Sequence, residues 1–433
     1  MAQELIQLNT RRIVVKLLLL ALLFAAGLWS YFVVRWYIGN TLAEYFDPSG
    51  NNLRVAEMAE SLAPADPLTH WRVAQVQQHS LPLDQQAQSL IEYERAVQLS
   101  PNDYRFWMAL GTASEQTGDT AKAERALKQA VTLAPAYAYP RWYLGNLYLR
   151  TGRYDDAFTE LRLASEADAA FQPQQFNLIW EIYGSDPEAL KKAVGETAAA
   201  RAKFAEYLLG RQKFDEGLRL WDTLGSDEKK ANRQTGESMV NTLVSAFRYH
   251  DAMRLWNDVT VNERFRVEVG RVFDGGFEDA VAPESFFAWQ VKALPQLQIG
   301  LDQEKSHSGA SSLRLVFHVR SNIENINISQ LVPVAPGTEY DFEFYVATEK
   351  LETGSPPLVQ IMDPTTSGVI VSSPAASNGN SDWTRVALSF KTGDKTEAVT
   401  IRIARPSCGT DEAPVCPIFG SVWYDDFSFQ RRN

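Results

Sequence analysis

The chain has 433 residues, of which 45% are hydrophobic and 11% aromatic, enough for two or three domains with packed cores. Its formal charge of -11 argues against a nucleic-acid partner, because such a surface needs clustered Lys and Arg, and none follows the extreme N-terminus. Five scattered His and two Cys likewise argue against a metal centre built from these residues.

An uncharged run from Leu17 to Val34 is long enough to span a bilayer. With the apolar residues on either side, it predicts a transmembrane helix at residues 13–38, preceded by a cytoplasmic tail at 1–12. More cations precede the run than follow it, so the positive-inside rule places the N-terminus in the cytoplasm. The cations are Arg11, Arg12 and Lys16 before the run and Arg35 after it.

A cleaved signal peptide is the alternative, because Ala25, Ala26 and Gly27 offer small residues for cleavage. The apolar character continues through Ile38, which favours retention of the helix. We therefore expect a single-pass protein of a bacterial inner (cytoplasmic) membrane, with the bulk of the chain periplasmic or extracellular.

Between Tyr104 and Phe171, a pattern of large and small residues returns after 34 positions. One unit holds Trp107, Leu110, Gly111, Gly118, Ala123, Leu127, Ala130 and Pro135, and the next holds Leu144, Gly145, Tyr148, Gly152, Tyr154, Ala157, Leu161 and Ala164. An earlier, weaker copy keeps Tyr93, Ala96 and Pro101. A period of this length with helical spacing inside it indicates stacked helix pairs. The pattern resembles the tetratricopeptide repeat (TPR) family.

The resemblance implies an all-α TPR-like solenoid over residues 41–260, with its clearest repeats at 70–103, 104–137 and 138–171. Leu53 to Pro64 matches a lone second helix of a repeat, and the spacing returns in degraded form near Phe214 and Tyr249. Such repeats are interaction scaffolds, so the resemblance implies a protein or peptide partner.

Within these repeats, one side of each first helix carries the repeat pattern and the other side, by resemblance, lines a concave groove. The predicted groove residues are Trp71, Gln78, Arg105, Met108, Gln116, Tyr139, Trp142, Asn146 and Arg150. Mixtures of aromatic residues and Arg often anchor interfaces. The alternative is that Trp71 and Trp142 simply pack against adjacent helices.

From residue 265 to 433, helical spacing gives way to short alternating segments separated by Gly, Pro, Asn and Ser, which predict an all-β sandwich. The segments are Ser312–Val319, Tyr340–Val346, Thr384–Phe390 and Val399–Ile403. The domain opens on Phe273-Asp274-Gly275-Gly276-Phe277-Glu278 and closes on Val422-Trp423-Tyr424-Asp425-Asp426-Phe427. With Trp289, Ser308-Gly309 and Trp383 in order between them, it resembles carbohydrate-binding modules of the CenC type, which are galactose-binding-domain-like jelly rolls.

This resemblance implies a structural calcium joining the first and last strands, with Glu278 and one of Asp425 or Asp426 as ligands; the alternative is strand-end acids without metal. It also implies aromatic platforms if the domain binds sugar. Trp289, Trp383 and Trp423 occupy positions where the family uses core aromatics, which leaves Phe286, Phe287 and Tyr345 as candidate platform residues.

Cys408 and Cys416 enclose a short loop, and outside the cytoplasm we expect them to form a disulfide. The sequence contains no nucleophile elbow, zinc-protease motif or phosphate-binding loop, so we predict no catalysis and no required cofactor. The order of anchor, repeats and sandwich suggests a non-catalytic scaffold, and we expect it to be accessory to cell-surface polysaccharide assembly or export. The alternatives are a glycan-processing hydrolase or its accessory module, and a purely structural protein scaffold.

Overall fold

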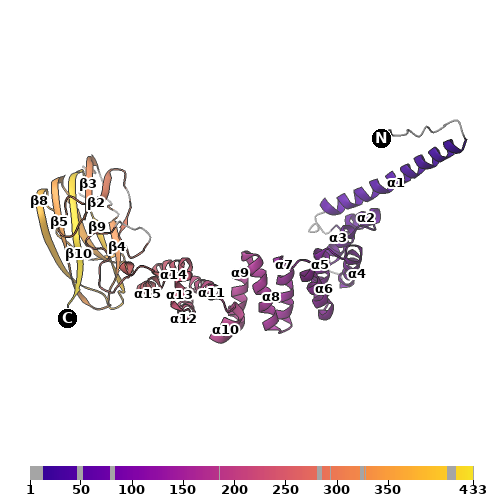
Figure 1. Ribbon diagram of the computed structural model, residues 1–433, viewed down its shortest axis with the longest axis horizontal. Coiled ribbons are helices and arrows are strands. Elements are labelled where there is room, and N and C mark those ends of the chain that lie inside the picture. Colours follow the sequence, from indigo (N-terminus) through magenta and orange to yellow (C-terminus); the bar gives the residue numbers. More distant parts are fainter. Residues whose placement is uncertain are drawn as a thin grey trace, which may run out of the picture. The chain divides into compact units, whose positions relative to one another are not determined.

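The computed structural model describes residues 13–45, 52–78, 83–184, 186–279, 285–292, 294–321, 326, 328–406 and 416–432. The chain divides into two compact units, Met1–Gly195 and Glu196–Asn433 (Figure 1). The described part of the first unit is helical, and the second unit combines helices with two antiparallel sheets. The predicted fold class, an all-α solenoid followed by an all-β sandwich, is therefore confirmed.

The first unit begins with α1 (Ile13–Tyr45), which passes beyond the predicted span of 13–38, and α2 (Leu53–Leu62). Antiparallel helix pairs follow. They are α3 (Pro67–Gln78) with α4 (Leu83–Leu99), α5 (Tyr104–Gln116) with α6 (Thr120–Leu133), and α7 (Ala138–Arg150) with α8 (Tyr154–Ala167). The unit ends with η2 (Ala169–Phe171), α9 (Gln172–Tyr183) and α10 (Pro187–Val194).

Close approach explains the small residues of the repeat pattern. A Cβ atom on Gly145 in α7 would lie 2.8 Å from Cγ of Leu161 in α8, a distance that real Cβ contacts do not show. Gly111 has the same relation to Leu127, at 2.6 Å, in the preceding pair. In the α5–α6 and α7–α8 pairs, a larger residue at this position would force the neighbouring leucine to move.

Ion pairs add a link between successive pairs. Glu124 of α6 accepts hydrogen bonds from Lys128 in its own helix and from Arg153, just before α8. These two cations lower the pKa of the Glu124 carboxyl to about 2. The contacts lie largely in solvent, so they contribute less to stability than the buried Ala and Leu residues between the helices.

The C-terminal end of α1 packs against the repeat stack. Gly39 and Ala43 are the buried residues of this helix, and a Cβ on Gly39 would lie 2.8 Å from the carbonyl oxygen of Ala59 in α2. The guanidinium of Arg72 in α3 donates to the carbonyl of Ala43 at 2.8 Å. The segment predicted as a lone second helix, α2, is thus paired with the end of α1.

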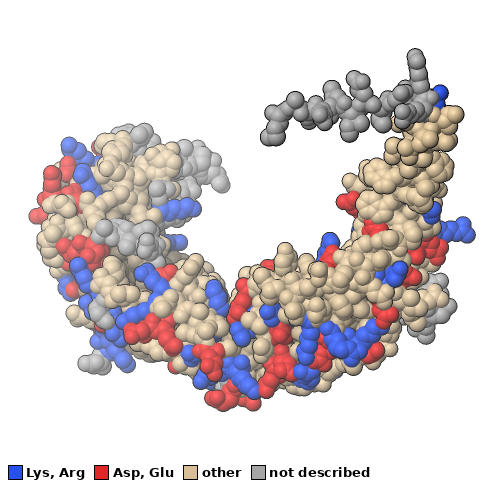
Figure 2. Space-filling view, turned by 45° about the vertical axis from the view of Figure 1, so that its right-hand side comes forward, with Lys and Arg blue, Asp and Glu red and all other residues tan. Residues whose placement is uncertain are grey.

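The remainder of α1 is apolar and exposed. Among the described residues, this helix alone is long and apolar enough to cross a membrane, judged by length and composition. Its exposed side chains include Leu23, Phe24 and Trp29, each at least 70% accessible. The surface of α1 is accordingly almost free of charge in Figure 2, whereas the helix pairs carry many charged residues.

The second unit starts with α11 (Ala198–Gly210), α12 (Phe214–Asp222), α13 (Ser226–Ala231), α14 (Arg233–Ser245), α15 (Tyr249–Val259) and η3 (Glu263–Phe265). Helix α15 contacts the sandwich directly: His250 donates from Nε2 to the carbonyl of Val334 at 2.9 Å. Asn257 exchanges two hydrogen bonds with the backbone of Val267. These bonds attach the last helix to the β-domain.

The sandwich consists of two five-stranded antiparallel sheets. One has the order β1 (Gln290–Val291), β4 (Ile328–Pro333), β9 (Ala398–Ala404), β6 (Leu358–Asp363) and β7 (Gly368–Ser372). The other has the order β2 (Leu297–Asp302), β3 (Ser312–Ser321), β10 (Ile418–Arg431), β5 (Glu339–Thr353) and β8 (Gly379–Lys391). The four segments predicted as strands lie within β3, β5, β8 and β9.

Alternation along the strands sets the core and the two outer faces. In β5, Tyr340, Phe342 and Phe344 are buried between the sheets, so Tyr345 points to the outside. The β1-β4-β9-β6-β7 sheet contains no aromatic residue in its described strands, whereas all strands of the other sheet except β2 contain at least one. Any aromatic platform on a sheet face must therefore belong to the β2-β3-β10-β5-β8 sheet.

Candidate functional site

The predicted groove residues lie on the first helices of three successive pairs, α3, α5 and α7. Polar contacts link them from one pair to the next: Gln78 donates to Gln116 at 2.7 Å, and Arg150 forms an ion pair with Glu115. Arg105 is held by Asp103, the residue that caps α5. These side chains form a continuous polar strip along the first helices.

The tryptophans of this set are partly used in packing. Trp71 meets Phe106 edge-on, with ring centroids 5.6 Å apart, and Trp142 lies 4.7 Å from Phe171. Asn146 donates to the carbonyl of Trp142 in its own helix, and Met108 packs partly buried against the α6–α7 core. Both indoles thus contact adjacent helices, as the alternative interpretation holds.

Tyr139 differs from its neighbours. Its side chain is 57% exposed, although one edge meets the ring of Phe171 at 5.3 Å. The exposed phenol, with Arg150 at the other end of the same helix, leaves an amphipathic contact surface available on α7. Binding by these residues remains a prediction.

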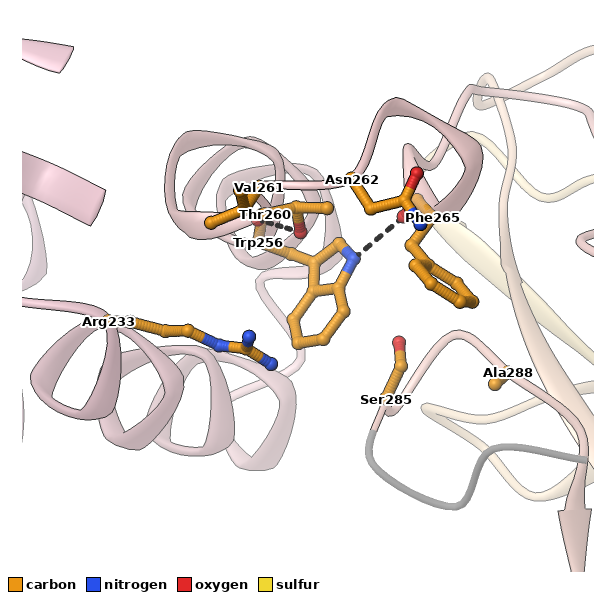
Figure 3. Close-up of a pocket in the computed structure, with 8 residues that line it drawn as sticks. All are labelled: Arg233, Trp256, Thr260, Val261, Asn262, Phe265, Ser285 and Ala288. Carbon is orange, nitrogen blue, oxygen red and sulfur yellow. Dashed lines mark hydrogen bonds between the residues drawn. The ribbon is translucent and has the colours of Figure 1, made fainter. Parts of the chain in front are cut away.

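A small pocket lies in the second unit between α14, α15 and the β-domain (Figure 3). Its lining includes Trp256, whose indole nitrogen donates to the carbonyl of Phe265 at 3.1 Å, and Arg233, which extends from α14. The volume is about 200 Å³, below the roughly 300 Å³ at which small-molecule sites begin. The pocket is a gap at the junction of helices and sandwich, and its indole is already hydrogen-bonded.

Of the three residues predicted as platforms for sugar rings, one is wrong. Phe287 is 1% exposed and its ring is therefore inaccessible to a ligand. Phe286 is exposed at 36%. Tyr345 lies on the outer face of β5, where the imidazole of His307 stacks on its ring at a centroid distance of 3.5 Å.

The predicted buried role of the tryptophans holds for Trp289, which packs in the inter-sheet core, and for Trp423, but not for Trp383. Trp383 is partly exposed and meets His307 edge-on at 5.9 Å, so it extends the aromatic group on the outer face. Trp423 is 2% exposed, but it faces outward, beneath the ammonium of Lys305 at 3.9 Å. Segment 303–311 covers it, and Asp302 accepts its indole hydrogen. Alternation in β10 places Trp423 on the face opposite Tyr424, which lies in the core.

We call His307, Tyr345 and Trp383 the outer aromatic cluster. The sequence analysis missed His307, because only the fold brings segment 303–311 over β5. The nearby Ser308-Gly309 motif was a signal that this segment makes a defined turn, but it did not indicate which strand the turn covers.

The three predicted calcium ligands come together next to the same segment. Glu278 accepts from the amide of Ala310 at 2.9 Å, and buried Asp425 accepts from the amide of His307 at 2.7 Å. Burial raises the pKa of Asp425, and Asp426 also accepts from the hydroxyl of Ser308. These oxygens suit calcium chemically, but each already accepts protein hydrogens, so calcium remains a prediction.

The predicted disulfide involves Cys408, which lies outside the described residues. Cys416 is buried just before β10. The Cys408–Cys416 pairing therefore stays a prediction.

Two tetratricopeptide repeat models match the chain, over residues 86–138 and 115–179. These ranges contain the α5–α6 and α7–α8 pairs. Protein IFIT1 homolog B of Homo sapiens is 27% identical over 142 residues, which are 29% of this chain and 29% of that protein. The chain therefore spans under a third of the length of this curated relative.

Solved structures of two kinds are similar to parts of the chain. A MamA protein is 14% identical, covers 51% of this chain and 95% of its own, and has a TM-score of 0.28. A structure entitled "CBM4 structure and function" is 10% identical and covers 37% of this chain and 99% of its own, with a TM-score of 0.28. The CBM22-1 xylan-binding domain from Paenibacillus barcinonensis Xyn10C is 13% identical and covers 38% and 97%, with a TM-score of 0.24. Residues 86–179, which include the α5–α6 and α7–α8 helix pairs, thus match tetratricopeptide repeats in both sequence pattern and helix pairing.

Proposed function

We propose that the chain is a membrane-anchored, non-catalytic scaffold of a bacterial envelope, whose repeats bind a protein partner outside the cytoplasm. The observation that carries the proposal is the packing of Gly39 and Ala43, at the end of the apolar helix α1, into the repeat stack. Cleavage after Gly27 would leave an exposed apolar stump attached to a folded domain, so retention of α1 is favoured. A reporter fused after Asn433 that is active only outside the cytoplasm tests the orientation.

The partner surface is the polar strip on the first helices of the repeats. A photo-reactive phenylalanine analogue in place of Tyr139 is expected to form a discrete crosslinked adduct in cells, because this side chain is 57% exposed on α7. Lys128 on α6, with 56% side-chain exposure, is the matched position on a second helix, where no adduct is expected. Equal crosslinking from both positions, or none from either, would contradict partner binding by the first helices.

A second role, glycan binding by the sandwich, is favoured by the outer aromatic cluster. The partly exposed ring of Trp383 is of the kind that stacks on the apolar faces of sugars, and it lies beside His307, which covers one face of Tyr345. Arg385, opposite Tyr345 in the register and paired with Glu343, adds a polar group next to them. Such a contact would suit an accessory factor in surface polysaccharide assembly or export.

Replacing Trp383 with alanine is expected to weaken glycan binding about tenfold, because the loss of one stacking ring costs on the order of 1.4 kcal/mol. Affinity electrophoresis of the full chain through gels with soluble neutral polysaccharides measures the change. Phe419→Ala is the control, since Phe419 is a 37% exposed aromatic residue in β10 outside the cluster. If no polysaccharide retards the wild-type chain, or if both variants are retarded like wild type, the sandwich is a purely structural domain.

A further inference from the structure

A buried histidine lies between two carboxylates in the first unit. His70 of α3 is 6% exposed, and its Nδ1 atom is 2.7 Å from Oε2 of Glu92 in α4 and 3.6 Å from Oε1 of Glu60 in α2. The ligand atoms of these three side chains all lie within 4.8 Å of one another. Because the three residues lie in three different helices, no local sequence motif identifies them as a group.

The other ring nitrogen determines what Nδ1 can do. Nε2 of His70 is 2.9 Å from the carbonyl oxygen of Pro64, and a carbonyl only accepts, so Nε2 carries a hydrogen. Nδ1 is therefore the nitrogen that faces the carboxylates, and it binds either a second proton or a metal ion. A ring whose far N–H is held by a backbone carbonyl has the orientation typical of histidine metal ligands.

The charge balance of the cluster favours a dication. Two carboxylates face a group that supplies at most one positive charge. A divalent ion would neutralise both carboxylates at once.

We propose that Glu60, His70 and Glu92 form a binding site for a divalent transition metal of the zinc class. An imidazole nitrogen with two carboxylates suits zinc, whereas calcium and magnesium prefer oxygen ligands alone. Ligands about 2.0–2.2 Å from a tetrahedral zinc lie roughly 3.3–3.6 Å apart, which the Glu60–His70 separation of 3.6 Å meets. Glu92 must withdraw by over half an ångström, and its side chain, 23% exposed, is free to do so. A water molecule completes the fourth position.

The site has a structural consequence. It joins α2, which packs against the end of α1, to both helices of the α3–α4 pair. Metal loading would thus tie the helix next to the anchor to the start of the repeat stack. The histidines are scattered along the sequence, which predicted no histidine metal centre. The fold nevertheless brings Glu60 and Glu92 next to His70.

The experiment uses the full-length, untagged chain in detergent, stripped of metal with a chelator. Calorimetric titration with Zn²⁺ should show one site per chain, and Co²⁺ should give the visible absorption of a tetrahedral complex with nitrogen and oxygen ligands. His70→Gln and Glu92→Gln should each weaken Zn²⁺ binding by at least 10–100-fold, the loss caused by removing even an outer-shell partner.

The matched control is His318→Gln, because His318 is an exposed histidine of the sandwich whose Nε2 lies 2.6 Å from Oε1 of Gln298. Its Zn²⁺ affinity should equal that of the wild type. Circular dichroism without metal checks the fold of each variant, and Glu60→Gln replaces His70→Gln if the latter unfolds. Absence of stoichiometric binding, or equal affinity in the Glu92→Gln and His318→Gln variants, would overturn the metal site and leave His70 as a buried structural residue that pairs with Glu92.

Discussion

Gly275→Ala is expected to destabilise the second unit by about 1–3 kcal/mol, because the added methyl group has no space to occupy. A Cβ on Gly275 would lie 2.0 Å from the carbonyl oxygen of Phe427 in β10. The atoms of Phe427 in this contact belong to the main chain, and its amide also donates a hydrogen bond to the carbonyl of Gly275 at 2.9 Å. No side-chain rotation can relieve this clash, so the opening segment of the sandwich must separate from its last strand.

Gly300→Ala is the control for this variant. Gly300 lies in β2 of the same sandwich, and a Cβ there meets nothing within 4 Å. The control should be neutral or stabilise by up to about 1 kcal/mol through the entropy of the unfolded chain. The measurement is the urea midpoint of the second unit, followed by hydrogen exchange of β10 peptides. Equal midpoints for the two variants would show that the contact between Gly275 and Phe427 is unimportant.

The second large effect is expected at Arg405. Its guanidinium is buried after β9 and donates to the carbonyl oxygens of Ser355 at 2.9 Å and Cys416 at 2.6 Å, and to the hydroxyl of Thr353 at 2.8 Å. Arg405→Met would remove this donor from the carbonyl of Cys416, and would leave the carbonyl of Ser355 and the hydroxyl of Thr353 with only the hydrogen bonds that these two residues make to each other. A hydrogen bond from a charged donor contributes about 1.5–3 kcal/mol. We expect a total loss of at least about 3 kcal/mol, seen as a lower urea midpoint.

Arg432→Met makes the same replacement at an exposed site. Arg432 pairs with Asp341 in solvent, with 53% and 45% of the two side chains accessible, so its loss should cost under about 1 kcal/mol. A similar midpoint for both variants would mean that the acceptors around Arg405 find water, and that the buried guanidinium contributes little.

The helix pairs could be predicted because their contacts are local. Gly145 meets Leu161 within one pair, and the next pair repeats the relation after 34 residues, so a single period contains the packing rule. The final turns of α1 escaped prediction because no second copy of that arrangement exists in the sequence to compare with it.

The sandwich was predictable in class but not in detail. Alternation marked Tyr340–Val346 as a strand, yet it could not show whether an outward residue lies in open solvent or under a loop. Trp423 is covered by a segment near Asp302, 121 residues earlier, and Tyr345 by His307. Such long-range contacts produce no regular spacing in the sequence. For this reason the core role predicted for Trp383 was wrong, and His307 was not identified.

The way α1 ends has a mechanical consequence. At about 1.5 Å per residue, its 33 residues extend roughly 50 Å, against a hydrocarbon layer of about 30 Å. With its apolar part in a bilayer, the last turns stand clear of the lipid and are clamped by α2 and α3, without a hinge between. Any tilt of the membrane-embedded part of α1 would therefore rotate the first repeats through the same angle.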